Sequence, residues 1–280
     1  MTTDADPPWQ RIMLATEHTK FDVGAERVAI ALSRGTRHPL AIVVPLVSND
    51  ELLAEAPALA ERLDAEASIR RSELLRAAAE AGMRVDVRVR EDAEASRAIV
   101  DSARELEADL VVVRVRGHRG VLARLMVGAM ATNVAAHAPC DVLMVPHAAQ
   151  IWQSAVLAGI DNSPASMVVA SAAARMARRF ALPLHLVAVA PDSSEGATTG
   201  ARDALRRAIE SLAREHHPAE GSVRTGKPQE EIVATATERG ADLIVVGRHG
   251  ASGALRRAVL GSIAQKVVGL ASCPVLVVKT

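Results

Sequence analysis

The sequence predicts an α/β protein of two similar domains, each built on an open, doubly wound sheet of five parallel strands. Three observations carry this prediction: one long passage occurs twice, the strand-like runs are apolar nearly throughout, and those runs alternate with amphipathic helical stretches. Parallel strands that are covered on both faces are apolar without strict alternation. Strands that alternate with helices along a chain indicate a doubly wound sheet.

The repeated passage sets the expected domain organisation. Residues 109–145 align without a gap with residues 242–278, and residues 11–19 correspond to the segment that begins at Ser154. A duplication of this length indicates two copies of one folding unit. The boundary is expected at residues 147–153, HAAQIWQ. The two predicted domains span residues 1–147 and 154–280.

The elements are clearest in the second copy. One helix is expected over residues 165–180 and another over residues 200–217, where an apolar stripe at i, i+4 and i+7 starts from Leu205. The segment APDSSEGATTGARD, residues 190–203, is expected to be a loop. The predicted strands are AVLAGI (155–160), PLHLVAVA (183–190), GSVRT (221–225), DLIVVG (242–247) and PVLVV (274–278).

The composition excludes several classes of function. Lys plus Arg and Asp plus Glu both number 33, so no net field attracts nucleic acid or an anionic membrane. The chain has two Phe, two Trp and no Tyr, which leaves few platforms on which single-stranded bases could stack. Two cysteines do not make a disulfide framework, and no apolar run is long enough to span a membrane. We therefore expect a cytoplasmic protein that binds neither nucleic acid nor membrane.

A glycine-rich passage follows the fourth strand of the second copy: VVGRHGASGALRRAVLGS, residues 245–262. The strand ends at Gly247, so the residues after it lie at the carboxyl edge of the sheet, where doubly wound sheets bind ligands. Gly247 and Gly250 would let the backbone approach a phosphate. A helix that begins near Leu260 would add unpaired N–H groups and the hydroxyl of Ser262. The passage predicts a phosphate cradle that is neither a Walker A loop nor a GxGxxG motif.

Five segments of the second copy resemble the universal stress protein family, and the resemblance extends over nearly the whole chain as two copies. They are AGIDNSPAS (158–166), VRTGKPQEEI (223–232), ADLIVVGRHG (241–250), LGSIAQKVV (260–268) and CPVLVV (273–278). The resemblance implies a tandem protein with a Rossmann-like fold of the adenine-nucleotide alpha hydrolase-like type. It also implies an intrachain pseudo-dimer through the final strands, CDVLMV and CPVLVV, and leaves a homodimer open.

The same resemblance implies that the second copy binds an adenine nucleotide, ATP, with Mg²⁺ on its phosphates. Family members that bind ATP have Gly-x-x-Gly, nine residues and then Gly-Ser or Gly-Thr. Here ten residues separate Gly250 from Gly261, and the extra residue either forms a bulge or displaces the cradle. The resemblance places Asp161 beside the ribose and phosphates, and the adenine beside backbone near Val189, with Gly226 on the same edge. The residues expected to bind the nucleotide are Asp161, Val189, Gly226, Gly247, Gly250, Gly261 and Ser262.

The first copy departs from this pattern. It has Glu17, Arg114 and Ala129 where the second copy has Asp161, Gly247 and Ser262. The long side chain of Arg114 would fill the place where a phosphate needs bare backbone, so we expect a degenerate site and one ATP per chain. Gly117, Gly120 and Gly128 persist in the first copy, which indicates that these positions serve the fold.

Simpler interpretations stay open for the second copy. Glycine is preferred where φ is positive, so Gly247 and Gly250 could serve the turn alone. Asp161 could cap the next helix, a role compatible with binding. His249 has no Ser or Cys partner placed for catalysis and is expected to be a solvated loop residue. No catalytic residue and no metal site made by the protein are expected.

Together these features favour a stress-response and signalling module that holds ATP in its second domain. The alternative is a scaffold or regulator that binds no nucleotide and acts through protein partners. An adenylating ligase or an ATP pyrophosphatase is disfavoured, because the chain has no His-x-Gly-His and no Ser-Gly-Gly-x-Asp-Ser near its first strand. No nucleophile or acid/base constellation stands out, so we expect no enzyme activity beyond slow ATP hydrolysis.

Overall fold

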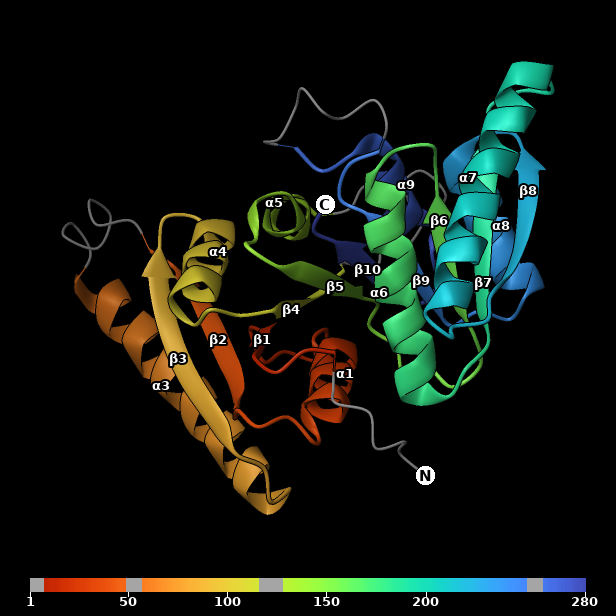
Figure 1. The fold of residues 1–280 in the computed structure, drawn as a ribbon. Coiled ribbons are helices and arrows are strands. Elements are labelled where there is room, and N and C mark those ends of the chain that lie inside the picture. Colours follow the sequence, from red (N-terminus) through yellow and green to blue (C-terminus); the bar gives the residue numbers. More distant parts are fainter. Residues whose placement is uncertain (1–7, 49–56, 116–127, 251–258) are drawn as a thin grey trace. The chain divides into compact units, whose positions relative to one another are not determined.

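The computed structural model describes residues 8–48, 57–115, 128–250 and 259–280. The chain forms two compact units (Figure 1). The first unit contains residues 9–116 and 128–151, and the second contains residues 152–280. Within the described ranges, no helix is long and apolar enough to cross a membrane.

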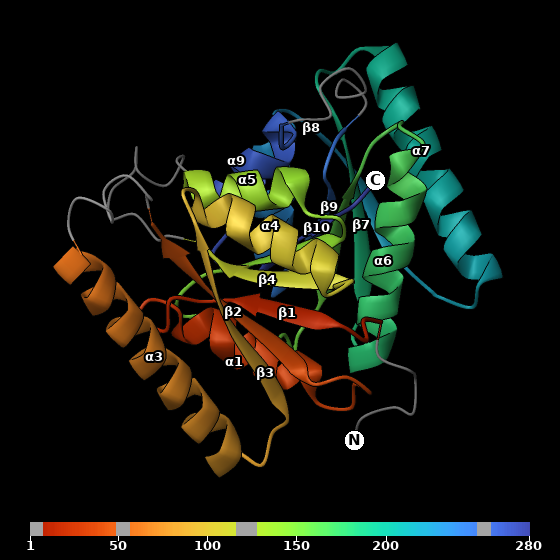
Figure 2. The ribbon, with the colours of Figure 1, turned by 90° about the vertical axis from the view of Figure 1, so that its left-hand side faces the viewer.

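The first unit alternates strands and helices along the chain. Its described elements are β1 (Ile12–Ala15), α1 (Val23–Ser33), β2 (Leu40–Val47), α3 (Pro57–Glu80), β3 (Val85–Asp92), α4 (Ala95–Glu105), β4 (Leu110–Arg114), α5 (Ala129–His137) and β5 (Asp141–Val145). The strands run parallel in the order β3-β2-β1-β4-β5. Figure 2 shows α1 and α3 on one face of this sheet and α4 and α5 on the other.

The second unit repeats the pattern. Its described elements are β6 (Val156–Ile160), α6 (Ala165–Phe180), β7 (Leu184–Ala190), α7 (Glu195–Arg214), β8 (Glu220–Thr225), α8 (Pro228–Glu238), β9 (Leu243–Gly247), α9 (Ser262–Leu270) and β10 (Val275–Val278). The strands run parallel in the order β8-β7-β6-β9-β10. The prediction of two doubly wound parallel sheets is confirmed.

In each unit the strand order reverses beside the first strand. β1 lies between β2 and β4, and β6 lies between β7 and β9. The connections on the two sides of such a reversal run over opposite faces of the sheet, which leaves a crevice at the carboxyl ends of the strands. Every residue of β4 and β10 is buried, as expected of parallel strands covered on both faces.

The sheet register relates positions of one unit to positions of the other. Arg114 pairs with Val145 in the first unit, and Gly247 pairs with Val278 in the second. Arg114 and Gly247 therefore hold equivalent places, each at the carboxyl end of the fourth strand of its unit. This equivalence allows the two sites to be compared residue by residue.

Helix α7 begins earlier than the sequence predicts. It starts at Glu195, inside residues 190–203, the segment expected to be a loop. The hydroxyl of Ser194, the N-cap, accepts a hydrogen bond from the backbone N–H of Ala197 at 3.4 Å. Such a cap stabilises a helix by about 1 kcal/mol, and burial of Ala201 adds to it, which offsets roughly 1 kcal/mol for each of the two early glycines. The loop prediction is wrong from Glu195 onward.

An aspartate just before the fourth strand fixes the start of the first strand in each unit. Asp109 accepts hydrogen bonds from the backbone N–H groups of Gln10 at 2.7 Å and Arg11 at 3.0 Å. Asp242 accepts hydrogen bonds from the backbone N–H of Gln153 at 2.7 Å and from those of Ser154 and Ala155. The tryptophan before each of these glutamines is buried. The repeat thus includes a shared Trp-Gln pair that was available in the sequence and was missed.

Candidate functional site

A pocket of about 360 Å³ opens in the second unit at the carboxyl ends of β6 and β9. Its volume falls within the range of small-molecule sites, about 300–1,000 Å³. The pocket lies where the strand order reverses, which is where doubly wound sheets bind their ligands. All residues expected to bind a nucleotide except Gly226 line it: Asp161, Val189, Gly247, Gly250, Gly261 and Ser262.

Asp161 follows β6 and is held by the turn that leads into α6. Its Oδ1 accepts hydrogen bonds from the backbone N–H of Ser163 at 2.9 Å and from the hydroxyl of Ser166 at 2.8 Å. Ser166 is buried, so this side of the carboxylate is fixed inside the fold. The N-cap position of α6 is Pro164, and no side chain caps the helix. The interpretation of Asp161 as the helix cap is therefore wrong.

The glycines of the site do not adopt left-handed backbone. None of Gly247, Gly250 and Gly261 has a φ in that region, so the interpretation that Gly247 and Gly250 serve a positive-φ turn is wrong. At Gly261 a β-carbon would lie 2.8 Å from the carbonyl oxygen of Arg248, which accepts the Gly261 N–H at 2.9 Å. This glycine serves the fold. At Gly250 the nearest contact of a β-carbon would be Oδ2 of Asp161 at 3.1 Å, which lies within the pocket.

The N-terminus of α9 faces the pocket. Gly261 is its N-cap, no side chain caps it, and its first turn contains no acidic residue. Ser262, Ile263 and Ala264 of this turn line the pocket. The first N–H groups of a helix have no acceptor within the helix and carry the positive end of the helix dipole. This side of the pocket therefore favours an anion.

The opposite side of the pocket is apolar. Val189 near the end of β7 lines it together with Pro228 and Ile232 of α8. Gly159 in β6 permits this arrangement, because a β-carbon there would lie 2.8 Å from Cδ1 of Ile232. Gly159 was missed from the sequence, although a glycine inside a strand is itself a sign of close approach by another group.

Gly226 lies in the turn between β8 and α8 and does not line the pocket. Its φ is +145°, and its N–H donates to the carbonyl of Ala190 at 2.9 Å. A β-carbon would lie 3.1 Å from Oε1 of Glu231. Because this φ favours glycine, Gly226 serves the turn that leads to Pro228, a residue of the pocket wall.

Charged groups are few among the described residues of the pocket wall. Asp161 is the one Asp or Glu there, and the wall as described has no Lys or Arg. Nε2 of His249 lies 3.1 Å from the carbonyl oxygen of Val259. The described part of the chain has no group of three or more His, Cys, Asp or Glu side chains placed to hold a metal ion. Gly117, Gly120 and Gly253 of the glycine passages lie outside the described residues.

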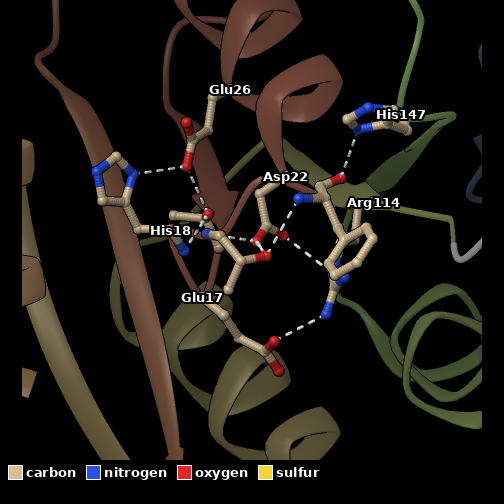
Figure 3. Close-up of polar contacts among 9 residues, drawn as sticks. Glu17, His18, Asp22, Glu26, Arg114 and His147 are labelled. Carbon is tan, nitrogen blue, oxygen red and sulfur yellow. Dashed lines mark hydrogen bonds and ion pairs between the residues drawn. The ribbon is translucent and has the colours of Figure 1, made fainter. Parts of the chain in front are cut away.

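The first unit has a cluster of charged side chains at the equivalent edge (Figure 3). Nη2 of Arg114 donates to Oε2 of Glu17 at 2.7 Å. Nε of Arg114 lies 2.9 Å from Oδ1 of Asp22, as an ion pair without the alignment of a hydrogen bond. Both Arg114 and Asp22 are buried. The guanidinium thus lies inside the fold, against the turn between β1 and α1.

Backbone and hydroxyl donors also differ between the units. The strand register places Pro45 of β2 where the second unit has Val189, and proline has no N–H. Helix α5 begins with Ala129, whereas α9 begins with Ser262. The first unit therefore lacks one backbone N–H and one hydroxyl that the second unit has at these positions.

The chain matches a known protein family along nearly its whole length. The model of the universal stress protein family matches the chain twice, over residues 8–146 and 154–279. The chain belongs to the universal stress protein family. A universal stress protein of Mycolicibacterium smegmatis is 32% identical over 212 residues, which are 71% of this chain and 70% of that protein.

A solved structure of a universal stress protein from Archaeoglobus fulgidus shares the fold. It covers 96% of this chain and 96% of its own, with a TM-score of 0.68 and 18% identity. Another from Archaeoglobus fulgidus, solved in complex with dAMP, covers 45% of this chain and 98% of its own, with a TM-score of 0.38 and 26% identity.

Proposed function

We propose that the second unit binds an adenine nucleotide, with ATP as the expected ligand, and that the chain acts as a nucleotide-binding stress-response module. The supporting observation is the meeting, in one pocket, of an uncapped helix N-terminus, Gly250 and the carboxylate of Asp161. A nucleotide offers a partner to each of them. Its phosphates suit the N–H groups, and its ribose hydroxyls suit a carboxylate.

The phosphates would lie against the first turn of α9. The backbone N–H groups of Ser262 and Ile263 would donate to phosphate oxygens, as at other helix N-termini that bind anions. Each such charge-assisted hydrogen bond contributes about 1.5–3 kcal/mol. Gly250, which has no side chain, leaves space for the phosphates beside Asp161.

The base would lie against the apolar wall. Val189, Pro228 and Ile232 offer a surface to the flat face of an adenine ring. The backbone at the end of β7 offers polar groups for its edge. Pro45 at the equivalent place in the first unit removes one of these groups, which supports an assignment to the second unit alone.

Mg²⁺ would arrive with the phosphates. This ion needs about six oxygen ligands and is usually held by one or two carboxylates together with phosphate oxygens and water. Asp161 supplies one carboxylate on the side of the pocket near Gly250, so the residues fit an ion that is carried mainly by the nucleotide. When bound, the ion would neutralise phosphate charge.

We propose binding, not catalysis, as the role of this pocket. The hydroxyls of Ser163 and Ser166 are both hydrogen-bonded to Asp161, and the ring of His249 is directed to the carbonyl of Val259. These groups hold the walls of the pocket in place. Slow hydrolysis of ATP by water is compatible with this role.

Mass spectrometry of the small molecules released when freshly purified chain is denatured tests the proposal. We expect an adenine nucleotide from the wild-type chain and its loss from a Gly250→Leu chain purified in parallel. If neither preparation releases an adenine nucleotide and none binds on addition, the proposal fails. The scaffold that acts through protein partners would then be favoured.

A further inference from the structure

The charged cluster of the first unit contains a buried ion pair that links two elements of the fold. The side chain of Arg114 is only 8% exposed and the side chain of Asp22 is 1% exposed. Oδ2 of Asp22 accepts hydrogen bonds from the N–H of Thr19 at 2.9 Å and from its hydroxyl at 2.6 Å. Asp22 also directly precedes α1. One buried ion pair therefore joins the end of β4 to the turn that starts α1 (Figure 3).

The second unit has neither charge of this pair. Gly247 holds the place of Arg114, and the repeat aligns Asp22 with Ser166. The hydroxyl of Ser166 lies 2.7 Å from the main-chain oxygen of Asp161, so the residue at the place of Asp22 contacts the turn through a neutral group. The carboxylate of Asp161 accepts the N–H of Ser163 in the same turn. The two units thus differ by a matched pair of opposite charges.

A third position differs in volume. A β-carbon on Gly247 would lie 3.2 Å from Cγ2 of Val169 and 3.2 Å from the carbonyl oxygen of His249, both tighter than ordinary contact. The repeat aligns Val169 with Ala25, which is 1% exposed in α1. The smaller side chain of Ala25 leaves room at the place where the chain of Arg114 leaves β4.

We propose that Arg114, Asp22 and Ala25, with Glu17, form an arginine lock. In this lock a built-in cation takes the place of a ligand in the first unit. The cation holds the β1–α1 turn in one conformation at all times. A buried charge is strongly destabilising when its partner is removed. The three positions must therefore change together. The lock also closes the first unit to anionic ligands. The guanidinium of Arg114 could attract an anion, but it is already paired with the carboxylates of Glu17 and Asp22.

An arginine at Gly247 would not by itself rebuild the lock in the second unit. Arg114 shows that the turn of the first unit accepts an arginine. In the structure the arginine is accepted together with Asp22 and Ala25, and the second unit has Ser166 and Val169 in their places. Gly247→Arg alone would bury a cation against Val169 with no counterpart of Asp22. In the described pocket wall, only Asp161, at the place of Glu17, would offer it a carboxylate.

Two sets of variants of the full chain, studied without nucleotide, test the lock. In the first unit, amide hydrogen exchange of the β1–α1 turn is followed by mass spectrometry in Arg114→Gly and in Arg114→Gly/Asp22→Ser. We expect Arg114→Gly to speed exchange at least about tenfold and the double variant to return to within about threefold of wild type. Arg114→Lys, which keeps the charge but loses the fork, should lie between them.

In the second unit the lock is grafted. Gly247→Arg should lower the midpoint of thermal unfolding by several degrees, and Gly247→Arg/Ser166→Asp/Val169→Ala should recover at least half of the loss. A double variant of the first unit that exchanges as fast as Arg114→Gly, or folds no better, overturns the proposal. A grafted triple variant no more stable than Gly247→Arg also overturns it. These readouts use no ligand, so they stand or fall separately from nucleotide binding.

Discussion

Asp161 and Gly250 lie close together in the pocket of the second unit: a β-carbon on Gly250 would be 3.1 Å from Oδ2 of Asp161. The other carboxylate oxygen of Asp161 is tied to Ser163 and Ser166. The carboxylate at the turn after β6 thus lies beside the backbone of the loop after β9. This narrow, polar side of the pocket is where a substitution should separate binding from folding.

Gly250→Leu should lower the affinity for ATP at least about 100-fold, because the side chain displaces two or more charge-assisted hydrogen bonds. The midpoint of thermal unfolding should change little, since Gly250 has no left-handed backbone. Calorimetric titration and a melting curve on one preparation measure both. Gly200→Leu on α7, where a β-carbon meets nothing within 4 Å, is the matched control and should bind like wild type. Equal affinities for the two variants would remove Gly250 from the site.

Ser262→Asp should move stability and affinity in opposite directions. Ser262 is exposed in the first turn of α9, which has no acidic residue. A carboxylate there interacts favourably with the helix dipole and should raise the free energy of unfolding by about 0.3–1 kcal/mol. The same charge should repel phosphate and weaken ATP binding at least tenfold. A variant that binds ATP as tightly as wild type would show that the phosphates lie elsewhere.

The strands and the edge that holds the site could be predicted because both depend on local pattern. Apolar runs mark β4 and β9. Gly247 ends such a run, so its place at the carboxyl edge of the sheet follows from local sequence alone. The start of α7 could not be placed in this way, because a cap at Ser194 and tertiary burial outweigh two glycines. Gly226 was placed on the correct edge, but its role depends on a φ that sequence does not display.

The arginine lock was out of reach of sequence reasoning for a different reason. Arg114 and Asp22 are 92 residues apart, and only the fold shows that they form an ion pair. The aligned copies display three separate substitutions, and their common cause is spatial. The pairing of the two units through their final strands stays a prediction.

His185 in β7 should make the second unit less stable in acid. Its side chain is buried, and burial lowers its pKa from 6.5, with Arg239 adding to the effect and Glu220 opposing it. The folded protein therefore holds a neutral imidazole, whereas the unfolded chain takes up a proton near pH 6.5. Because the unfolded state binds more protons, the contribution of His185 to the free energy of unfolding is complete above pH 6.5. It decreases as the pH falls below that value.

Thermal unfolding between about pH 7.5 and pH 5.5 measures this dependence. We expect the midpoint to fall towards acid in the wild-type chain and to fall less in His185→Gln, which keeps a polar group near Ser222. Identical pH dependence of the two chains would contradict a neutral, buried His185.

Asp242→Ala should destabilise the second unit without touching the pocket. Asp242 holds the backbone at the start of β6, at the edge opposite the pocket, and leaves three N–H groups without this acceptor when removed. We expect a loss of about 1–3 kcal/mol in the free energy of unfolding. ATP affinity, measured well below the unfolding temperature, should be unchanged. Asp109→Ala is the matched control in the first unit, and an effect of Asp242→Ala on affinity would contradict a purely structural role.

Calorimetric titration of the full chain with ATP and Mg²⁺ tests nucleotide binding by the second unit most directly. An open pocket beside Gly247 and an arginine-filled site at Arg114 predict a stoichiometry near one nucleotide per chain. Gly250→Leu should abolish this binding, and Arg114→Lys, in the first unit, should leave it intact. Two equivalent sites per chain, or no binding at millimolar ATP, would contradict the assignment.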